Sequence, residues 1–261
     1  MIRRRLYIEV RVSKLATWSR RIAIFAIPVV LLAIGMNRLG LVEYKVAAAA
    51  LIAGFAVAGF ALLVALAAFT VIWNEGLRGL GRAILATVIS LVIIGWPLIT
   101  LARSAALPVI ADITTDYNDP PQFVAVAQAR PRGANPVRYA GAAEARLQRA
   151  AYPGVKPFEV EANPDEVFNT LMQTVAQRGW RVLDSVSPRG GQRDGRIEAV
   201  AQTLVMGFRE DVVIRVRSGD KGVRIDMRSA SRYGDRDFGS NARRIESFMA
   251  DFADARRRSM H

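Results

Sequence analysis

The sequence has no cysteine, and its one histidine is His261, the last of the 261 residues. Without cysteine the chain has no disulfide bond, no thiolate nucleophile and no cysteine ligand for zinc or an iron–sulfur cluster. A single histidine at the end of the chain also excludes the usual histidine-based catalytic triads and histidine metal sites. The remaining chemistry rests on carboxylates, arginines and hydroxyls, so we expect no catalytic residue of the usual types, no cofactor and no metal.

Charged residues are scarce in one part of the chain. Between positions 22 and 110 only seven residues carry a charge, whereas 24 basic and 20 acidic residues occur among the 151 residues from position 111 onward. The mean hydropathy of the whole chain is nevertheless +0.19, so the apolar residues must be concentrated in the first part. The sequence therefore predicts a membrane domain at 22–107 and a water-soluble part after it.

Three apolar stretches lie in the membrane domain. Val46–Trp73 has 28 residues without a charge and Ala83–Ala102 is also uncharged, and both reach the length of about 20 residues that crosses a bilayer. Ile22–Met36 has only 15 residues and includes Pro28, although apolar residues up to position 42 can extend it. We expect three transmembrane helices, at about 22–42, 46–73 and 83–107. The alternative is that the first stretch is buried or re-entrant and that two helices span.

Positive charge near the N-terminus predicts the orientation in the membrane. Residues 1–21 contain seven basic residues and one acidic residue, Glu9. Basic flanks stay on the cytoplasmic side of a membrane, so we expect a cytoplasmic N-terminus. Three spans then place the C-terminal half on the outer face, whereas two spans leave it in the cytoplasm.

The first part of the water-soluble half is rich in proline. Pro108, the pair Pro120 and Pro121, and three further prolines interrupt residues 108–155. Proline disfavours helix in the residue before it and cannot donate to a sheet. We therefore predict an extended linker over 108–155, with a short helix around 142–151, and a compact domain at 156–261.

Residues 156–261 show the periodicities of a small α+β domain. Period-two alternation predicts strands, and amphipathic stretches predict two helices, the first of which begins after the N-cap Asn163 with Pro164 at its first position. The expected order is β-α-β-β-β-β-α, with strands at 158–162, 180–186, 196–204, 211–216 and 223–230 and helices at 164–178 and 238–252. This order implies an antiparallel sheet with the helices on one side.

Three stretches contain more polar and charged residues than the packing of a domain requires. They are DITTDYNDPPQF at 112–123, MGFRED at 206–211 and RSASRYGDRDFGSNARR at 228–244. Together they resemble the bacterial and plant family known as domain of unknown function 1499, whose members carry a D-I-(S/T)-T-D stretch before PP-x-F and an RSxSRxGxxDxGxNxRRI segment. The resemblance covers about residues 111–252, and many members have N-terminal membrane spans. The resemblance implies no established activity, and we expect a bacterial inner-membrane protein.

The candidate site residues come from these stretches. On an extended strand Arg228 and Arg232 share one face, and Ser229 and Ser231 share the other. One interpretation is an ion-paired network that fixes the turn at 233–239. The other is an anion site, because arginine binds phosphate or carboxylate through two parallel hydrogen bonds. The full set is Asp112, Thr115, Asp116, Asp119, Glu210, Asp211, Arg228, Ser229, Ser231, Arg232, Asp237, Asn241 and Arg244.

We expect a non-enzymatic role, in which a membrane-anchored periplasmic domain binds an envelope protein or an anionic ligand such as a lipid head group. One alternative is an enzyme that uses carboxylates and arginines with a divalent cation held by Asp112, Asp116 and Asp119. Another is a cytoplasm-facing scaffold, if two helices span. The net charge of +13 does not indicate nucleic-acid binding, because eight of these charges lie in residues 1–101 and no aromatic stacking platform follows.

Overall fold

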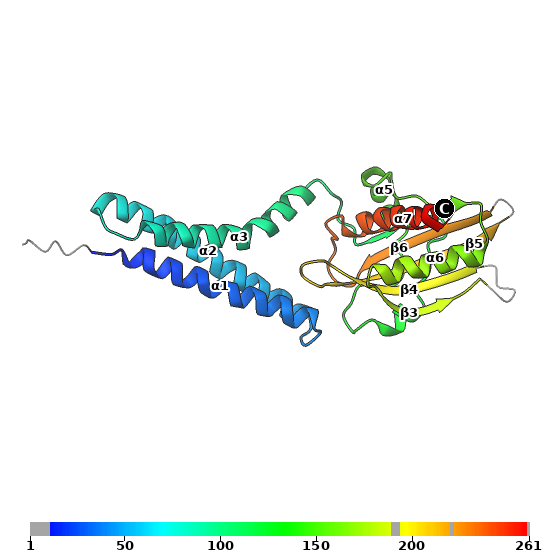
Figure 1. Cartoon of the computed structure of the whole chain (residues 1–261), viewed down its shortest axis with the longest axis horizontal. Helices are drawn as coiled ribbons and strands as arrows, with labels where there is room; N and C mark the ends of the chain where they lie inside the picture. Colours follow the sequence, from blue (N-terminus) through cyan, green and yellow to red (C-terminus); the bar gives the residue numbers. More distant parts are fainter. Residues whose placement is uncertain (1–10, 189–193, 220–221, 260–261) are drawn as a thin grey trace, which may run out of the picture. The chain divides into compact units, whose positions relative to one another are not determined.

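The computed structural model describes residues 11–188, 194–219 and 222–259. The chain divides into two compact units, residues 1–103 and residues 104–261 (Figure 1). The arginines at positions 3–5, on which part of the expected orientation rests, and His261 lie outside the described residues.

Three long helices form the first unit: α1 (Lys14–Arg38), α2 (Tyr44–Glu75) and α3 (Leu80–Ser104). Each of these described helices is long and apolar enough to cross a membrane, which confirms the expectation of three candidate spans. α1 begins eight residues before the apolar stretch that predicts it, because the Ser13 side chain accepts a hydrogen bond from the Ala16 N–H and caps the helix. Its 25 residues extend about 37 Å, so the short apolar stretch lies within a helix of sufficient length.

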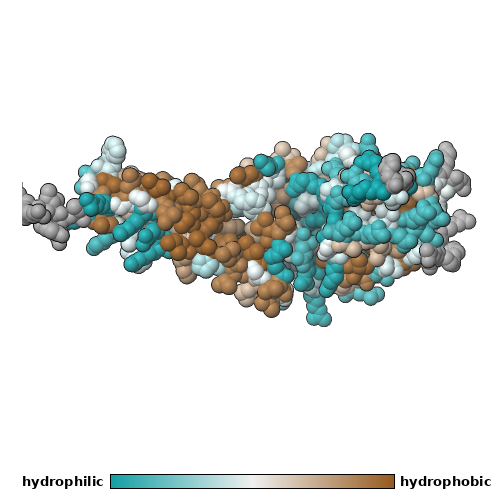
Figure 2. Space-filling view, viewed as in Figure 1, coloured by the Kyte–Doolittle hydropathy of each residue, from teal (hydrophilic) through white to brown (hydrophobic). Residues whose placement is uncertain are grey.

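Small side chains line the packed face of α2. The buried residues alternate at spacings of four and three, which keeps one face of a helix against its neighbour. They are Ala47, Leu51, Gly54, Ala58, Ala61, Ala65 and Ala68. A Cβ atom at Gly54 would lie 2.6 Å from Cγ2 of Val30 in α1, so glycine permits the close approach of these two helices. Large apolar side chains such as Leu31, Phe60 and Leu63 lie on the outside instead (Figure 2).

The second unit is an α+β domain built on one antiparallel sheet. Its strands are β1 (Asp112–Thr114), β2 (Phe158–Val160), β3 (Arg181–Val186), β4 (Asp194–Gln202), β5 (Arg209–Gly219) and β6 (Gly222–Ser231). Its helices are α4 (Ala125–Ala129), α5 (Ala142–Ala151), α6 (Pro164–Gln177) and α7 (Ser240–Ser259). The sheet order is β1-β6-β5-β4-β3, and β2 also pairs with β6, so the expected α+β class and antiparallel sheet are confirmed.

Residues 108–155 contain the short helix expected at 142–151, which is α5, but they do not otherwise form the extended linker that their prolines predict. β1 pairs with β6, with Asp112 opposite Ala230, and α4 belongs to the same unit. Gln148 of α5 holds the outer edge of β1, because its side chain donates to Thr114 O at 2.8 Å and accepts from the Thr114 N–H at 3.1 Å. A three-residue strand is too short to show alternation, and its partner strand is distant along the chain, so local periodicity does not reveal it.

The two faces of the sheet are covered differently. α6 and α7 pack on one face, which we call the helix face, and segment 115–140 with α4 packs on the other, which we call the loop face (Figure 1). Along β5, Val212 and Ile214 point into the main hydrophobic core on the helix face, whereas Asp211, Val213 and Arg215 point to the loop face. Neighbouring polar residues of one strand therefore lie on opposite sides of the domain.

A buried glutamate anchors the loop face. Glu198 of β4 is fully buried, and its carboxylate accepts hydrogen bonds from the backbone N–H groups of Val124 at 3.0 Å and Val126 at 2.9 Å. Phe123 and Val126 pack against Val213 of β5 beside it. The carboxylate thus satisfies N–H groups at the start of α4, where a negative charge is favoured.

Candidate functional site

The residues predicted from sequence do not form a single site, because β6 presents alternate side chains to opposite faces. Ser229 and Ser231 lie on the helix face, where both bond to Asn241. Arg228 and Arg232 lie on the loop face, where each binds a carboxylate. The side chains of these four residues therefore alternate between the two faces as expected, and this alternation places the serines and the arginines on opposite sides of the sheet.

Buried and half-buried polar side chains of β5, β6 and the start of α7 form what we call the helix-end network. Its members are Glu210, Ser229, Ser231, Asp237, Ser240, Asn241 and Arg244, of which Ser240 and Arg244 are half-buried. The Asn241 amide accepts from Ser229 Oγ at 2.7 Å and from Arg244 at 2.7 Å, and donates to Ser231 Oγ at 3.0 Å. Arg244 also pairs with Glu210, which extends the network to β5.

Asp237 precedes α7 by three residues within this network. Its carboxylate accepts from the backbone N–H of Gly239 at 2.9 Å, just before the helix, and of Asn241 at 2.8 Å, in the first turn, and so satisfies N–H groups at the helix start. Burial raises the pKa of Asp237, although these two hydrogen bonds act to lower it. Burial also lowers the pKa of Arg244 to about 10. These bonds fasten the turn at 233–239 to the sheet, which supports the interpretation as a structural network.

Arg228 is fully buried on the loop face and binds inside the domain. Its guanidinium binds Asp112 through two nitrogens, at 2.9 and 2.6 Å. It also donates to the carbonyl oxygens of Pro121 at 3.1 Å and Val137 at 2.7 Å. The guanidinium lies 4.6 Å from the centre of the Phe123 ring. Arg228 therefore fixes segment 121–137 on the sheet.

Asp211 joins two buried arginines. Its carboxylate accepts from Arg232 at 2.7 Å on one oxygen and from Arg130 at 2.7 Å on the other, and Asp211 itself is fully buried. Arg232 is 2% exposed. Neither Arg228 nor Arg232 thus presents its guanidinium to a ligand from solvent.

The predicted Thr115 continues the pairing of β1 with β6. Its backbone N–H donates to Met227 O at 2.9 Å, and its hydroxyl accepts from the Met227 N–H at 2.9 Å. The chain turns away from the sheet at the next residue, so Thr115 sets the position from which Asp116 and Asp119 reach the loop face.

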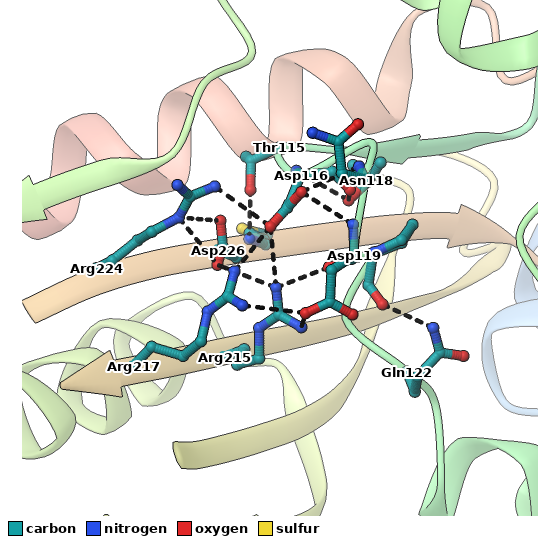
Figure 3. A network of polar contacts seen from close by, with 12 residues as sticks. Thr115, Asp116, Asn118, Asp119, Gln122, Arg215, Arg217, Arg224 and Asp226 are labelled. Carbon is teal, nitrogen blue, oxygen red and sulfur yellow. Dashed lines mark hydrogen bonds and ion pairs between the residues drawn. The ribbon is translucent and has the colours of Figure 1, made fainter. Parts of the chain in front are cut away.

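Asp116 and Asp119 join arginines that the sequence analysis did not single out. We call this group the arginine cluster (Figure 3). Its members are Arg215 and Arg217 of β5, Arg224 and Asp226 of β6, and Asp116 and Asp119 of the loop. Alternation in the sequences Arg215-Val-Arg217 and Arg224-Ile-Asp226 is the signal that could have placed them on one face.

Each carboxylate of the cluster binds more than one guanidinium. Asp226 Oδ2 lies 3.1 Å from Arg215 and 2.8 Å from Arg217. Asp116 Oδ2 lies 2.7 Å from Arg217 and 3.3 Å from both Arg215 and Arg224. Figure 3 shows the three arginines converging on these oxygens from two neighbouring strands. The carboxylates thus offset the repulsion between the three neighbouring guanidinium groups.

The strand register creates this repulsion. Arg217 lies directly opposite Arg224 in the β5–β6 pair, and like charges in that relation destabilise a sheet. Asp116 offsets it from the loop, since its other oxygen accepts from the N–H groups of Asn118 and Asp119, both at 3.1 Å. Burial raises the pKa of Asp116, but the Asp119 N–H, Arg217 and the Asn118 N–H together hold it below its ordinary value. The ionised carboxylate of Asp116 thus connects the loop at 116–119 to the arginines of the sheet.

Asp119 differs from the other two carboxylates in its exposure. Its Oδ2 lies 2.9 Å from Arg215 and 3.0 Å from Arg217, yet its side chain is 62% exposed. The side chains of Asp116 and Asp226 are 10% and 0% exposed. The arginine cluster therefore has two inner carboxylates and one that faces solvent.

A cavity of about 270 Å³ lies beside the end of β1, apart from the cluster, and Asp112, Asn135 and Glu144 are among its lining residues. Burial raises the pKa of Glu144, and neighbouring Asp112 raises it further. Within the described residues no group of three acidic, histidine or cysteine side chains is placed to hold a metal ion. Asp112 binds Arg228, apart from Asp116 and Asp119, so the carboxylates of the divalent-cation alternative do not converge.

Comparison with protein families gives one match. The model described as "Protein of unknown function (DUF1499)" matches residues 112–252, which is more than half of the chain. No curated protein and no solved structure matches. The matched range begins at β1 and ends in α7, so it contains the helix-end network, the buried arginine pairs and the arginine cluster.

Proposed function

The chain belongs to the DUF1499 family of proteins of unknown function, and from this starting point we propose that its α+β domain is a non-enzymatic module that binds an anionic ligand at the arginine cluster. The exposure of Asp119 carries this proposal. Asp119 bridges Arg215 and Arg217 from the solvent side, in the position that a carboxylate or phosphate of a ligand would take. A ligand can replace this one side chain without opening the domain.

The charge balance supports exchange at this position. Three arginines face three aspartates, so the cluster is neutral while Asp119 is in place. With the Asp119 side chain turned away, one positive charge is left, and Arg215 Nη1 and Arg217 Nη1 lose a shared acceptor. The loop keeps its place, because Arg215 also donates to the backbone oxygen of Asp119 at 2.7 Å. A side-chain rotation alone thus converts an internal ion pair into an anion site.

The binding test uses the full chain in lipid nanodiscs titrated with inorganic phosphate. We expect Arg217→Gln to abolish the heat of binding and Asp119→Ala to increase affinity, because the internal competitor is removed. Asp184→Ala is the matched control, since Asp184 is a partly exposed aspartate paired with Arg196 on the same sheet. Equal phosphate affinity in the native chain, Asp119→Ala and Asp184→Ala contradicts the proposal.

A second arm identifies the source of the anion. Nanodiscs of phosphatidylcholine are compared with nanodiscs that contain phosphatidylglycerol, both without added phosphate. Protection of the Asp119 loop from hydrogen exchange only with phosphatidylglycerol indicates a lipid head group, whereas protection only on addition of phosphate indicates a soluble anion. No protection in either arm contradicts binding at the cluster.

We also propose that the protein is a multi-pass protein of a bacterial inner membrane, with a cytoplasmic N-terminus and a periplasmic α+β domain. The basic residues of positions 1–21 and the three candidate spans support this orientation. The test is alkaline phosphatase fused after His261, with a fusion after Arg38 as the internal control. The periplasmic orientation requires phosphatase activity in both fusions. Activity in neither fusion is expected if α1 does not span, and it would place the domain in the cytoplasm and favour a scaffold there.

A further inference from the structure

Exposed apolar side chains gather at one end of the α+β domain. Among its described residues, seven large apolar side chains are exposed. Four of them belong to what we call the apolar end, defined by Val109, Leu204, Val205 and Phe238. Leu204 is 90% exposed, in the uncharged turn Thr203–Phe208 between β4 and β5. Soluble surfaces rarely expose apolar groups in such a cluster without a partner.

Strand pairing brings these side chains to the same edge. Gln202 pairs with Arg209, so the turn that contains Leu204 continues directly from this end of the sheet. Ser231, opposite Glu210, ends the neighbouring strand, and its N–H donates to Ala111 O at 2.8 Å. The turn at 203–208, the segment at 232–239 and the entry of the chain at 107–111 thus follow one another across neighbouring strands.

The chain enters the α+β domain at this end directly after α3. α3 ends at Ser104, and the carbonyl oxygen of Ser104 accepts a hydrogen bond from Arg236 Nη1 at 3.2 Å. The Asp237 N–H donates to Ile110 O at 3.2 Å. Six residues from Ser104 to Ile110 span at most about 20 Å. If α3 crosses a bilayer, the apolar end must therefore lie close to the surface from which α3 emerges.

The backbone also holds Phe238 in an outward position. Phe238 has φ of +52° and is the one described non-glycine residue with a positive φ, a conformation that costs free energy for a bulky side chain. The bonds from the backbone N–H groups of Gly239 and Asn241 to the Asp237 carboxylate hold the chain on either side of it. Phe238 is 40% exposed instead of joining the core.

We propose that the apolar end is seated in the interface of the bilayer that α3 crosses, with the turn Thr203–Phe208 as its deepest part. Arg209 and Arg243 are exposed beside it, against one exposed acidic residue of segment 232–239, Asp235, and this excess of basic residues next to an apolar patch favours an anionic membrane surface. Arg217 lies eight residues along β5 from Arg209, or about 27 Å, so the arginine cluster would stay in water. With this seating the anion bound at the cluster would be a soluble one, and protection of the Asp119 loop only by phosphatidylglycerol would contradict the seating.

The native absence of cysteine makes the test direct. The full chain with Leu204→Cys carries an environment-sensitive fluorophore and is reconstituted in vesicles of phosphatidylcholine and phosphatidylglycerol with a quencher on the upper acyl chain. Ser218→Cys is the matched control, because Ser218 is exposed on the same strand system at the opposite end of β5. We expect a blue-shifted emission and loss of most fluorescence at position 204, and neither at position 218.

Three results would overturn the proposal. Equal quenching at positions 204 and 218 shows that this end has no preferred contact with lipid. A blue shift at 204 without lipid quenching shows that a protein surface covers the turn. Unchanged quenching at a probe on Val205→Cys when Leu204→Ser and Phe238→Ser are combined shows that these side chains do not hold the domain on the membrane. Retained protease resistance of the combined variant verifies its fold.

Discussion

Replacing Asp211 with asparagine isolates the contribution of one buried carboxylate. Asp211 neutralises Arg130 and Arg232, whose side chains are 5% and 3% exposed. An asparagine side chain of the same shape carries no charge, and its NH₂ group would face one of the two guanidiniums. Both arginines would then remain buried next to a neutral amide.

Breaking a buried pair from one side costs about 3–5 kcal/mol, because the remaining charge stays desolvated. With a urea dependence of about 2 kcal/mol per M, the unfolding midpoint of the domain falls by roughly 1.5–2.5 M. Asp184→Asn removes a partly exposed partner of Arg196, where about 0–1 kcal/mol is expected. Both variants replace a carboxylate with an amide. The difference between their two shifts in unfolding midpoint therefore measures the effect of burying the ion pair.

Pulse proteolysis in urea suits this comparison, because the α+β domain can be followed while the membrane helices stay in detergent. The fraction of intact domain is read on a gel at each urea concentration. If Asp211→Asn and Asp184→Asn shift the midpoint by the same amount, the buried bridge does not stabilise the domain as the geometry implies.

Three further variants test other parts of the structure. Gln148→Ala leaves the backbone of Thr114 without its side-chain partners, so we expect a loss of about 1–3 kcal/mol and faster exchange of the Thr114 amide hydrogen. The pKa of Asp116 is lower in the folded state than its ordinary value of 3.8. The ionised carboxylate therefore stabilises the fold at pH values above 3.8, and this contribution disappears as the pH falls. Asp116→Asn should flatten the decrease in melting temperature between about pH 5 and pH 3. Gly54→Val places carbon against Val30, so α1 and α2 should separate more readily in sodium dodecyl sulfate than in the native chain.

The regular parts of the fold were predictable from the sequence because they depend on local signals. Asn163 and Pro164 mark the start of α6, and alternation marks β5 and β6. The long uncharged stretches predict α2 and α3. β1 was not predictable, because its hydrogen bonds come from β6 and from Gln148, and neither is visible in the three residues of the strand.

The candidate site was predictable only in part. The opposite directions of Arg228 and Ser229 follow from strand geometry, and the structure has them so. Which carboxylate each arginine binds depends on the loop path between β1 and α4, which sequence periodicity does not encode. The polar stretch at 228–244 drew attention to Arg228. Arg217 was missed because it follows the strand expected at 211–216, although β5 extends to Gly219 and Arg217 is the more exposed of the two arginines.

The pairing of β1 with β6 bears on how the protein is made. Residues 112–114 leave the ribosome directly after α3, whereas their partners at 228–230 are synthesised more than a hundred residues later. At about 5–20 residues per second, the first strand waits roughly 6–24 s for its neighbour. Throughout this interval the growing chain has one end fixed by its hydrophobic anchor and no closed sheet. A nascent chain arrested before position 228 should therefore be degraded as an unfolded tail, however much of the domain it already contains.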